Sequence, residues 1–409
     1  MGAGLRMTVV AADIVSTRAA ICDVVRHTPV LPSEALSQRC GGRVVVKTEN
    51  LQRTGSFKLR GALSKLAALG RDCERGVVAG SAGNHAWALA EAARARGVPC
   101  EVFMPAQAPI AKVEGCVALS AVVRLTGDSV EDCFAAASAR AEEGGLAFVH
   151  PFDDRDVVAG QGTVGLELLD DVDDLAKVVV PLGGGGLASG IAIAVKSALP
   201  GVEVIGVQAR ACAAFAESLR RGEPVGVPSA LSIADGIAVK RPGALTLELV
   251  RRWLDDVVAV GEDAIAEAMV LLMQRSKLVV EGAGAVGVAA LLGGLVAPAA
   301  RGTTVVVLSG GNVDPGLLAA VARRHETQAG RRLVLFTRLP DHPGSLAALL
   351  RCVGDAGANL VEVEHVREGV ELHVRETAVQ LVLETRGAEH AEEMLATIAR
   401  EGYVARVVS

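Results

Sequence analysis

The sequence predicts an α/β protein in which a large parallel-sheet region is followed by a smaller ferredoxin-like unit. Between about Val44 and Asn312, short apolar runs rich in β-branched residues alternate with longer segments of helical period, which is typical of parallel α/β folds. Three glycine-rich stretches follow such apolar runs, and open α/β sheets bind their ligands where strands end. After Asn312 the predicted order becomes strand, helix, strand, strand, helix, strand.

Composition limits the classes to which the chain can belong. Its 409 residues are 51% hydrophobic, enough for two or three domains with large cores. The 41 basic and 47 acidic residues give a net charge of -6, and 2% of residues are aromatic. Nucleic acids and anionic membranes attract basic surfaces, and single-stranded nucleic acids need aromatic stacking platforms. We therefore expect a small-molecule substrate and neither a nucleic-acid nor a membrane partner.

Cysteine usage and the start of the chain predict a cytoplasmic protein. The eight cysteines form no C-x-x-C pair and no Cys/His cluster with metal-ligand spacing, so we expect reduced core residues and no metal site. No basic segment precedes an apolar one near the N-terminus, so no signal peptide is expected. The uncharged run from Gly282 to Ala300 is rich in Gly and Ala and contains Pro298, which favours a buried helix over a membrane span.

The elements of the large region are predicted from their periods and flanking turn residues. The expected strands are Val44 to Lys47, Val77 to Gly80, Cys100 to Met104, Ala121 to Leu125, Ala147 to His150, Lys177 to Pro181, Val202 to Val207 and Thr304 to Ser309. The expected helices are Ser56 to Leu69, Asn84 to Arg96, Val130 to Glu143, Gly160 to Leu169, Leu187 to Ala198 and Ala264 to Leu278.

The C-terminal unit is predicted to be a separate domain. The polar stretch RRHETQAGRR divides the chain into a domain at residues 1–322, a linker at 323–332 and a domain at 333–409. The expected strands of the last domain are Leu333 to Arg338, Asn359 to Val366, Ala378 to Thr385 and Val404 to Val408, and its helices are Gly344 to Asp355 and Ala388 to Arg400.

Lys58 is the first candidate for chemistry. The stretch from Lys47 to Ala62 reads KTENLQRTGSFKLRGA and places Lys58 on the first turn of a predicted helix. Backbone N–H groups point outward at a helix start and favour anions there. Most lysines are solvated surface residues, so Lys58 alone indicates little. Together with the stretches SAGNHA, GGGGL and SGGN, it indicates a site for a phosphate-bearing cofactor.

The stretch GGGGL, Gly183 to Leu187, predicts an anion site. It follows an apolar strand and begins a helix, so its N–H groups and the helix start can surround an anion. Four consecutive glycines are costly in chain entropy, which indicates that a ligand approaches the backbone closely. A dinucleotide site is the alternative, but it needs an acidic residue at the end of the next strand, and that strand ends at Gln208.

The other two stretches contribute neutral polar groups. In SAGNHA, Asn84 can hydrogen-bond a phenolic oxygen, and the N–H groups of this helix start can hold a carboxylate. His85 has an ordinary pKa suited to proton transfer, although a capping or packing role is the commoner one. In SGGN, Ser309 offers a hydroxyl at a strand end, which is a weak partner for a ring nitrogen and equally fits an ordinary turn.

With these motifs the chain resembles the fold-type II family of pyridoxal-phosphate enzymes, and within it the threonine ammonia-lyases, with serine racemase a near relative. Seven motifs occur in the family's order along nearly the whole chain: KTENLQRTGSFKLRGA, SAGNHA, HPFDD with GQGT, GGGGL, SIADG, EGAGA and SGGN. The resemblance implies a catalytic domain of two open twisted parallel-sheet subdomains that binds pyridoxal 5′-phosphate.

The resemblance also implies a role for each candidate. Lys58 would bind the cofactor covalently, Phe57 would pack on its ring, and Asn84 would contact its 3′-oxygen. The phosphate would be held by Gly183, Gly184, Gly185, Gly186 and Leu187, and Ser309 would face the pyridine nitrogen. The substrate carboxylate would be received by Ser81, Ala82, Gly83, Asn84 and His85.

The implied reaction is β-elimination of L-threonine, and also of L-serine, to a 2-oxo acid and ammonia. Lys58 would take the Cα proton before the β-hydroxyl leaves. A dehydratase for another β-hydroxy amino acid, such as serine or 3-hydroxyaspartate, stays an alternative, because Trp87 stands where many threonine enzymes carry glutamine. A non-catalytic amino-acid sensor is the alternative from another class.

At two places the sequence differs from the serine racemases, and each difference bears on the expected activity. Ala82 stands where serine racemases carry the serine that acts on the second face of the substrate, so racemisation is not expected. The stretch Gln208 to Ala214 reads QARACAA where the racemases carry acidic cation ligands. We therefore expect activity to be unchanged by a chelator.

The C-terminal unit resembles an ACT-type amino-acid-binding domain, through LPDHPGSLAALL followed by GANLVEVEH. Gly344 and Asn359 would flank an effector pocket at the interface of two such domains, which implies a homodimer or homotetramer. Inhibition by isoleucine, opposed by valine, is the allosteric hypothesis. The alternative is a dimerisation module that binds no effector.

Overall fold

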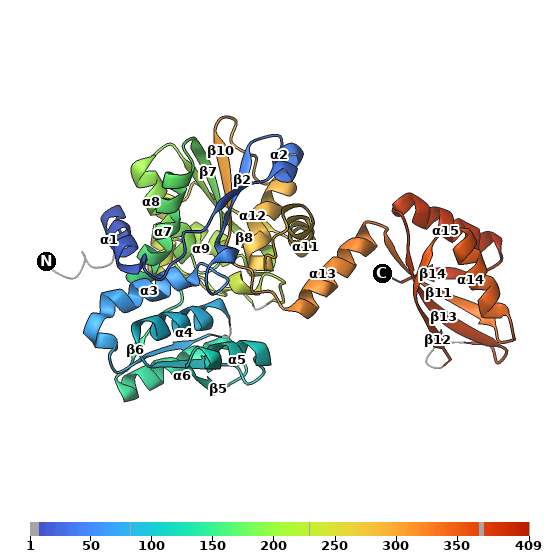
Figure 1. Cartoon of the computed structure of the whole chain (residues 1–409), viewed down its shortest axis with the longest axis horizontal. Coiled ribbons are helices and arrows are strands. Elements are labelled where there is room, and N and C mark those ends of the chain that lie inside the picture. The colour runs from blue at the N-terminus through green and yellow to red at the C-terminus, as the bar shows by residue number, and fades with distance from the viewer. Residues whose placement is uncertain (1–7, 82, 229, 368–371, 409) are drawn as a thin grey trace. The chain divides into compact units, whose positions relative to one another are not determined.

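The computed structural model describes residues 8–81, 83–228, 230–367 and 372–408 (Figure 1). The chain forms two compact units, Met1–Val313 and Asp314–Ser409. Among these described residues, unit 1 contains two sheets and unit 2 contains one. This arrangement confirms the predicted α/β class.

The larger sheet of unit 1 has six strands in the order β1-β2-β10-β7-β8-β9. These strands are β1 (Val30–Pro32), β2 (Val44–Thr48), β7 (Leu175–Pro181), β8 (Glu203–Ala209), β9 (Asp256–Val260) and β10 (Thr303–Leu308). Neighbouring strands are parallel except for β1 and β2. Every residue of β2 and β10 is buried, as expected for parallel strands covered on both faces.

The smaller sheet of unit 1 has four parallel strands in the order β5-β4-β3-β6. These strands are β3 (Val77–Gly80), β4 (Cys100–Met104), β5 (Val122–Leu125) and β6 (Ala147–Phe148). Its helices are α3 (Lys58–Leu69), α4 (Asn84–Arg96), α5 (Ile110–Ala118) and α6 (Val130–Gly144). Leu63, Leu89 and Val102 are fully buried in the apolar cluster that joins this sheet to α3 and α4.

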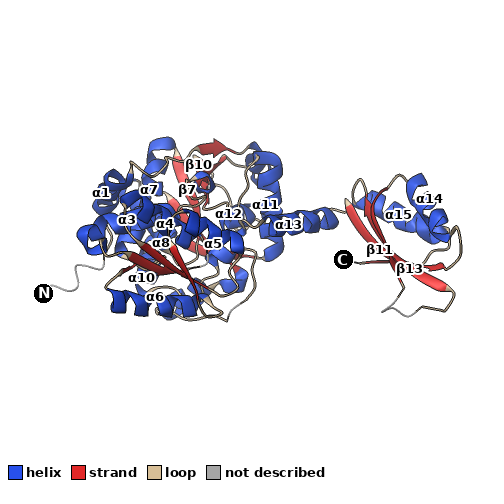
Figure 2. Ribbon diagram, turned by 60° about the horizontal axis from the view of Figure 1, so that its bottom comes forward, coloured by secondary structure: helices blue, strands red, loops and turns tan. Residues whose placement is uncertain are grey.

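Helices cover the larger sheet as well (Figure 2). They are α1 (Ala11–Ile21), α2 (Glu34–Cys40), α7 (Arg155–Asp171), α8 (Gly186–Ala198), α9 (Ala214–Arg221), α10 (Ala244–Trp253), α11 (Glu262–Leu271) and α12 (Gly282–Leu292). Helices α7 and α8 meet at glycines, since a Cβ atom on Gly190 would lie 2.6 Å from the Gly162 nitrogen. Helix α12 is almost wholly buried, which confirms the prediction of a buried helix after Gly282.

The structure differs from the predicted elements in several places. Edge strands β1 and β9 are absent from the predicted set, and both are only partly buried. Helices α1, α2, α5, α9 and α10 are also absent from the predicted set. Helix α7 begins at Arg155 rather than Gly160, because the Asp154 carboxylate accepts hydrogen bonds from the N–H groups of Asp156 and Val157.

Unit 2 begins with α13 (Pro315–Gln328), which includes residues 323–328 of the expected linker. Only Val321 of this helix is buried, so its polar composition resembles that of a linker. Asp314 caps the helix and Pro315 occupies its first turn, two start signals that identify it. The expected boundary at residue 322 thus falls inside a helix.

The rest of unit 2 has the predicted ferredoxin-like order. Its elements are β11 (Arg332–Pro340), α14 (Ser345–Asp355), β12 (Asn359–Val366), β13 (Glu376–Glu384), α15 (Ala388–Arg400) and β14 (Ala405–Val407). The antiparallel sheet has the order β12-β13-β11-β14. Both helices pack on one face of it, around Leu335, Leu349 and Met394 (Figure 1).

No helix within the described ranges is long and apolar enough to span a bilayer. The same residues contain no group of three His, Cys, Asp or Glu side chains that could hold a metal ion.

Candidate active site

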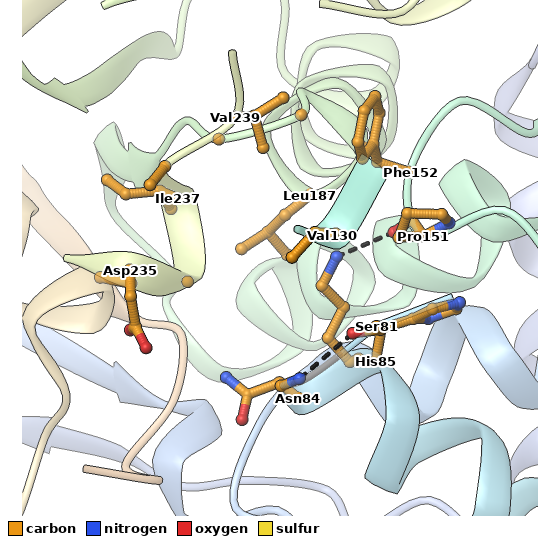
Figure 3. A pocket seen from close by; sticks show the side chains of 18 of the residues that line it. Ser81, Asn84, His85, Val130, Pro151, Phe152, Leu187, Asp235, Ile237 and Val239 are labelled. Atoms are coloured by element: carbon orange, nitrogen blue, oxygen red, sulfur yellow. Dashed lines mark hydrogen bonds between the residues drawn. The ribbon is translucent and has the colours of Figure 1, made fainter. Parts of the chain in front are cut away.

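A cavity of about 500 Å³ lies in unit 1 and brings the candidate stretches together. The helix starts of α3, α4 and α8 and the carboxyl ends of β3, β7 and β10 surround it. In Figure 3, Ser81 and Asn84 lie across the cavity from Ile237. The predicted residues that line it are Phe57, Lys58, Ser81, Gly83, Asn84, His85, Gly183, Gly184, Gly185, Gly186, Leu187 and Ser309. Ala82 lies outside the described residues.

Lys58 projects into this cavity from the start of α3. Its Nζ donates a hydrogen bond to the Pro151 carbonyl at 2.8 Å and lies 5.3 Å from the centre of the Phe57 ring. Burial lowers the pKa of Lys58 to about 8, although the nearby Glu281 carboxyl acts in the opposite direction. An amine with this pKa is partly neutral near pH 8, so it can act as a nucleophile or a base.

The start of α3 is fixed to the end of β10. The Phe57 N–H donates to the Ser309 carbonyl at 3.1 Å, and Ser56 forms an isolated bridge with Gly310. Ser309 is 2% exposed and lines the cavity. The backbone therefore sets the distance between Lys58 and Ser309, two residues that are 251 positions apart in sequence.

The four glycines form a close-packed turn before α8. Gly185 has φ of +94°, a left-handed conformation that favours glycine, and its Cβ atom would lie 2.9 Å from Phe215 and Thr246. A Cβ atom on Gly184 would overlap the Phe152 ring. No acidic residue lies in the first turn of α8, so the N–H groups at this helix start face no competing carboxylate on it. A phosphate group fits this turn.

Asn84 is held on two sides. Its Nδ2 donates to Glu281 Oε1 at 2.7 Å, and its Oδ1 accepts from Asn312 Nδ2 at 2.8 Å. Asn312 Nδ2 also donates to the Thr54 carbonyl at 2.8 Å. This arrangement directs the amide of Asn84 at the first turn of α4, beside the cavity.

The two histidines of the site are neutral. Burial, with the nearby Lys58, lowers the pKa of His85 to about 3, and its Nε2 donates to the Val149 carbonyl at 2.9 Å. Burial also lowers the pKa of His150 to about 4, and its Nδ1 accepts from the N–H of Asp153 at 2.8 Å. Hydrogen bonds to the backbone therefore fix both rings in place.

The cavity mouth is charged on both sides. Lys112 on α5 lies 3.8 Å from Asp235, and Lys240 lies 2.8 Å from Glu131 on α6. Each pair joins the small-sheet region to the segment between α9 and α10. The cavity thus has a polar rim around a largely apolar interior, a common design for small-molecule sites.

Several lining residues do not follow from sequence reasoning. Glu281, His150 and Phe152 belong to motifs used for the family resemblance, yet nothing in their spacing predicts that they line the cavity. Gln161 also lines the cavity, and its buried Oε1 has no hydrogen-bond partner among the residues that the structure describes. The signal that could identify them is the placement of each motif directly after a strand or before a helix.

The two expected effector residues lie at opposite ends of the sheet in unit 2. Gly344 precedes α14 with φ of +95°, four residues after β11 ends. Asn359 begins β12 and donates to Glu384 at 2.9 Å, beside the start of β11. One chain therefore does not bring these two residues together.

The comparisons with known proteins agree with this geometry. A family model described as pyridoxal-phosphate dependent enzyme matches residues 21–310. L-threonine ammonia-lyase from Thermotoga maritima is 43% identical over 397 residues, which cover 97% of this chain and 98% of that protein. The catabolic L-threonine dehydratase TdcB of Escherichia coli K12 is 45% identical over 305 residues, which cover 74% of this chain and 92% of TdcB.

A solved structure is similar as well. The threonine deaminase of T.th. superposes with a TM-score of 0.70 at 39% sequence identity. The match covers 75% of this chain and 99% of that one.

Proposed function

The chain belongs to the threonine ammonia-lyases, a group of pyridoxal-phosphate dependent enzymes, and we propose that it converts L-threonine into 2-oxobutanoate and ammonia in the cavity around Lys58. The observation that supports the residue assignment is the half-buried amine of Lys58, which has a lowered pKa and shares one cavity with the glycine turn Gly183 to Gly186.

The residues of the cavity fit pyridoxal phosphate. The glycine turn and the start of α8 would hold its phosphate, and Lys58 would hold its aldehyde carbon. Asn84 would donate to its 3′-oxygen and Ser309 would lie at its ring nitrogen. When bound, the cofactor withdraws electrons from the Cα atom of an amino acid and so weakens the Cα–H bond.

Within this arrangement Lys58 would move the proton. Its pKa of about 8 leaves a neutral fraction that grows as the pH rises through this value, and the neutral amine accepts the Cα proton. The Pro151 carbonyl, 2.8 Å from Nζ, orients the amine. Ser81 and the N–H groups at the start of α4 would hold the substrate carboxylate. The buried neutral His85 takes no proton in this scheme.

A variant of Lys58 tests this assignment. Lys58→Ala should lower threonine turnover by about 10²- to 10⁴-fold or more, the range for loss of a general base. It should also remove the lysine-dependent visible absorbance of the bound cofactor. Lys65→Ala is the matched control, because Lys65 lies on the same helix and pairs with Asp154 at 2.6 Å. Equal turnover in Lys58→Ala and the wild type would rule out the assignment.

The substrate range follows from the same site. L-serine shares the amino, carboxylate and β-hydroxyl groups of L-threonine and lacks one methyl group, so it is a second substrate in this proposal. An extra methyl group in an apolar pocket changes selectivity by about 10- to 200-fold at most. Trp87 does not decide this range by contact, because it packs on α5 and donates to the Lys112 carbonyl at 3.0 Å.

Unit 2 is proposed to be an ACT-like regulatory domain that binds a branched-chain amino acid. Its ferredoxin-like order and the loop after β11 support this proposal. Because Gly344 and Asn359 lie at opposite ends of one sheet, a pocket that contains both needs a second chain. The proposal therefore includes a homodimer or a homotetramer.

A further inference from the structure

A buried carboxyl group that the proposed reaction does not use lines the cavity. Glu281 immediately precedes α12, yet its side chain does not cap that helix. It turns instead toward α4, where Oε1 accepts a hydrogen bond from Asn84 at 2.7 Å. The residue is 5% exposed. A buried carboxyl is costly unless its hydrogen bonds compensate, so this position needs an explanation.

The surrounding backbone leaves room for this carboxyl group. A Cβ atom on Gly310 would overlap Glu281 Oε1, and one on Gly236 would lie 3.6 Å from it. The Glu281 N–H donates to the Gly310 carbonyl at 3.1 Å. The missing side chain of Gly310 therefore leaves the space that the carboxyl group occupies, while Gly236 lies at ordinary contact distance from it.

Glu281 and Asn312 fix the orientation of the Asn84 amide. The carboxylate oxygen of Glu281 can only accept from the Nδ2 group, while the Nδ2 group of Asn312 donates to Oδ1. Rotating the amide by half a turn would place the Oδ1 of Asn84 against the Glu281 carboxylate, two acceptors. It would also place its Nδ2 against the Nδ2 of Asn312, two donors. The fixed orientation leaves the second Nδ2–H of Asn84 without a partner among these groups.

Charged groups from three other elements face Glu281. Burial raises its pKa to about 7, and Asp235 adds to this effect, whereas the Asn84 hydrogen bond, Lys112 and Lys58 lower it. The Glu281 carboxylate in turn raises the pKa of Lys58 against the effect of burial. The two groups therefore change charge in neighbouring pH ranges, and each favours the charged form of the other.

We propose that Glu281 is a positioning residue of this enzyme, whose carboxylate holds the Asn84 amide with one N–H free for the 3′-oxygen of pyridoxal phosphate. This inference rests on the proposed function of Asn84. The hydrogen bond weakens when the carboxylate is protonated, because bonds to charged groups are the stronger ones. The wild-type kcat/KM therefore falls as the pH decreases through about 7.

Glu281→Gln in the cofactor-loaded protein tests this inference. The neutral side chain should lower kcat/KM by about 10-fold or more, the loss expected for a hydrogen bond to a charged group. It should reduce the decrease of kcat/KM near pH 7 to the part that protonation of Lys58 causes. It should also shift the visible absorbance maximum, because the 3′-oxygen belongs to the conjugated system. Glu91→Gln is the matched control, because Glu91 is also buried and lies on α4 but pairs with Arg94 at 2.8 Å.

A second variant acts on Asn84 from the other side. Asn312→Ala should shift the absorbance maximum while the decrease near pH 7 remains, because Glu281 is intact. A wild-type protein with no visible band after pyridoxal phosphate is added overturns the proposed function, and this inference with it. A normal wild-type band, with an unchanged maximum and an unchanged pH profile in Glu281→Gln, overturns the inference alone.

Discussion

The residues of the cavity are held largely by backbone contacts. His150 is an example, since its Nδ1 accepts from the N–H groups of Phe152 and Asp153 at 3.2 and 2.8 Å. Its ring also lies 4.8 Å from that of Phe152, edge to face. A protonated Nδ1 could not accept these bonds, so the fold requires the neutral ring.

Because the folded protein requires a neutral His150 ring, we predict that acid lowers its free energy of unfolding. The unfolded His150 binds a proton below its ordinary pKa of 6.5, whereas the folded ring stays neutral until about pH 4. The free energy of unfolding is therefore unaffected by His150 above pH 6.5 and decreases as the pH falls toward 4, by up to about 3 kcal/mol. Urea unfolding at several pH values should show a smaller decrease for His150→Gln. An identical slope in both proteins would contradict this cause.

At the scale of elements, a buried ion network joins α3 to α7 and to the end of β2. Arg60, which is 1% exposed, pairs with Glu49 at 2.8 Å and with Glu167 at 2.6 Å. Lys47 pairs with the same Glu167 at 2.7 Å. Because Arg60 is two residues after Lys58, the network fixes the helix that carries the proposed base.

Removing one member should leave buried charges without partners. Arg60→Met is expected to lower the free energy of unfolding by about 3 to 5 kcal/mol, because Glu49 and Glu167 lose their main partner. Arg71→Met is the control, since Arg71 is 95% exposed and its pair with Glu74 should contribute little. Chemical denaturation near pH 7 measures both. A change below about 1 kcal/mol for Arg60→Met would show that the network does not stabilise this fold.

The network also has a predicted pH dependence. Burial would raise the pKa of Glu167, but Arg60 and Lys47 outweigh burial and lower it below its ordinary value of 4.5. The unfolded carboxylate therefore binds its proton at a higher pH than the folded one. The corresponding stability is complete above pH 4.5 and is lost as the pH falls through the lowered pKa.

At the scale of the whole molecule, the two units divide the proposed roles. The cavity lies in unit 1, and the family model ends at residue 310, within this unit. The match to TdcB covers 92% of that protein with 74% of this chain. The 305 residues of this match are about as many as unit 1 contains.

A shortened chain that ends at Val313 is predicted to keep its cofactor absorbance and its threonine turnover. Unit 1 holds every proposed catalytic residue and has its own apolar cores. Millimolar isoleucine should change the rate curve of the full chain and not that of the shortened one. A folded shortened chain that does not bind pyridoxal phosphate would refute this division, and an equal isoleucine response in both would refute regulation through unit 2.

The fold class and the candidate site could be predicted from the sequence because both depend on local patterns. The glycine turn before α8 and Lys58 at the start of α3 are visible as short motifs beside strands or helices. Glu281 is different, since its role depends on contacts with Asn84, which is 197 positions away. Helix α13 also escapes prediction, because a helix with a single buried residue has the composition of a linker.

The central claim is that the chain turns over L-threonine through Lys58 and pyridoxal phosphate. Its most direct test is the simultaneous measurement of 2-oxobutanoate and ammonia after L-threonine is added to the purified, cofactor-loaded protein. We predict that both products form in equal amounts, that the visible absorbance responds to the substrate, and that Lys58→Ala forms both products at least about 100-fold more slowly. A wild-type protein that binds the cofactor but forms no 2-oxo acid from threonine would contradict the claim.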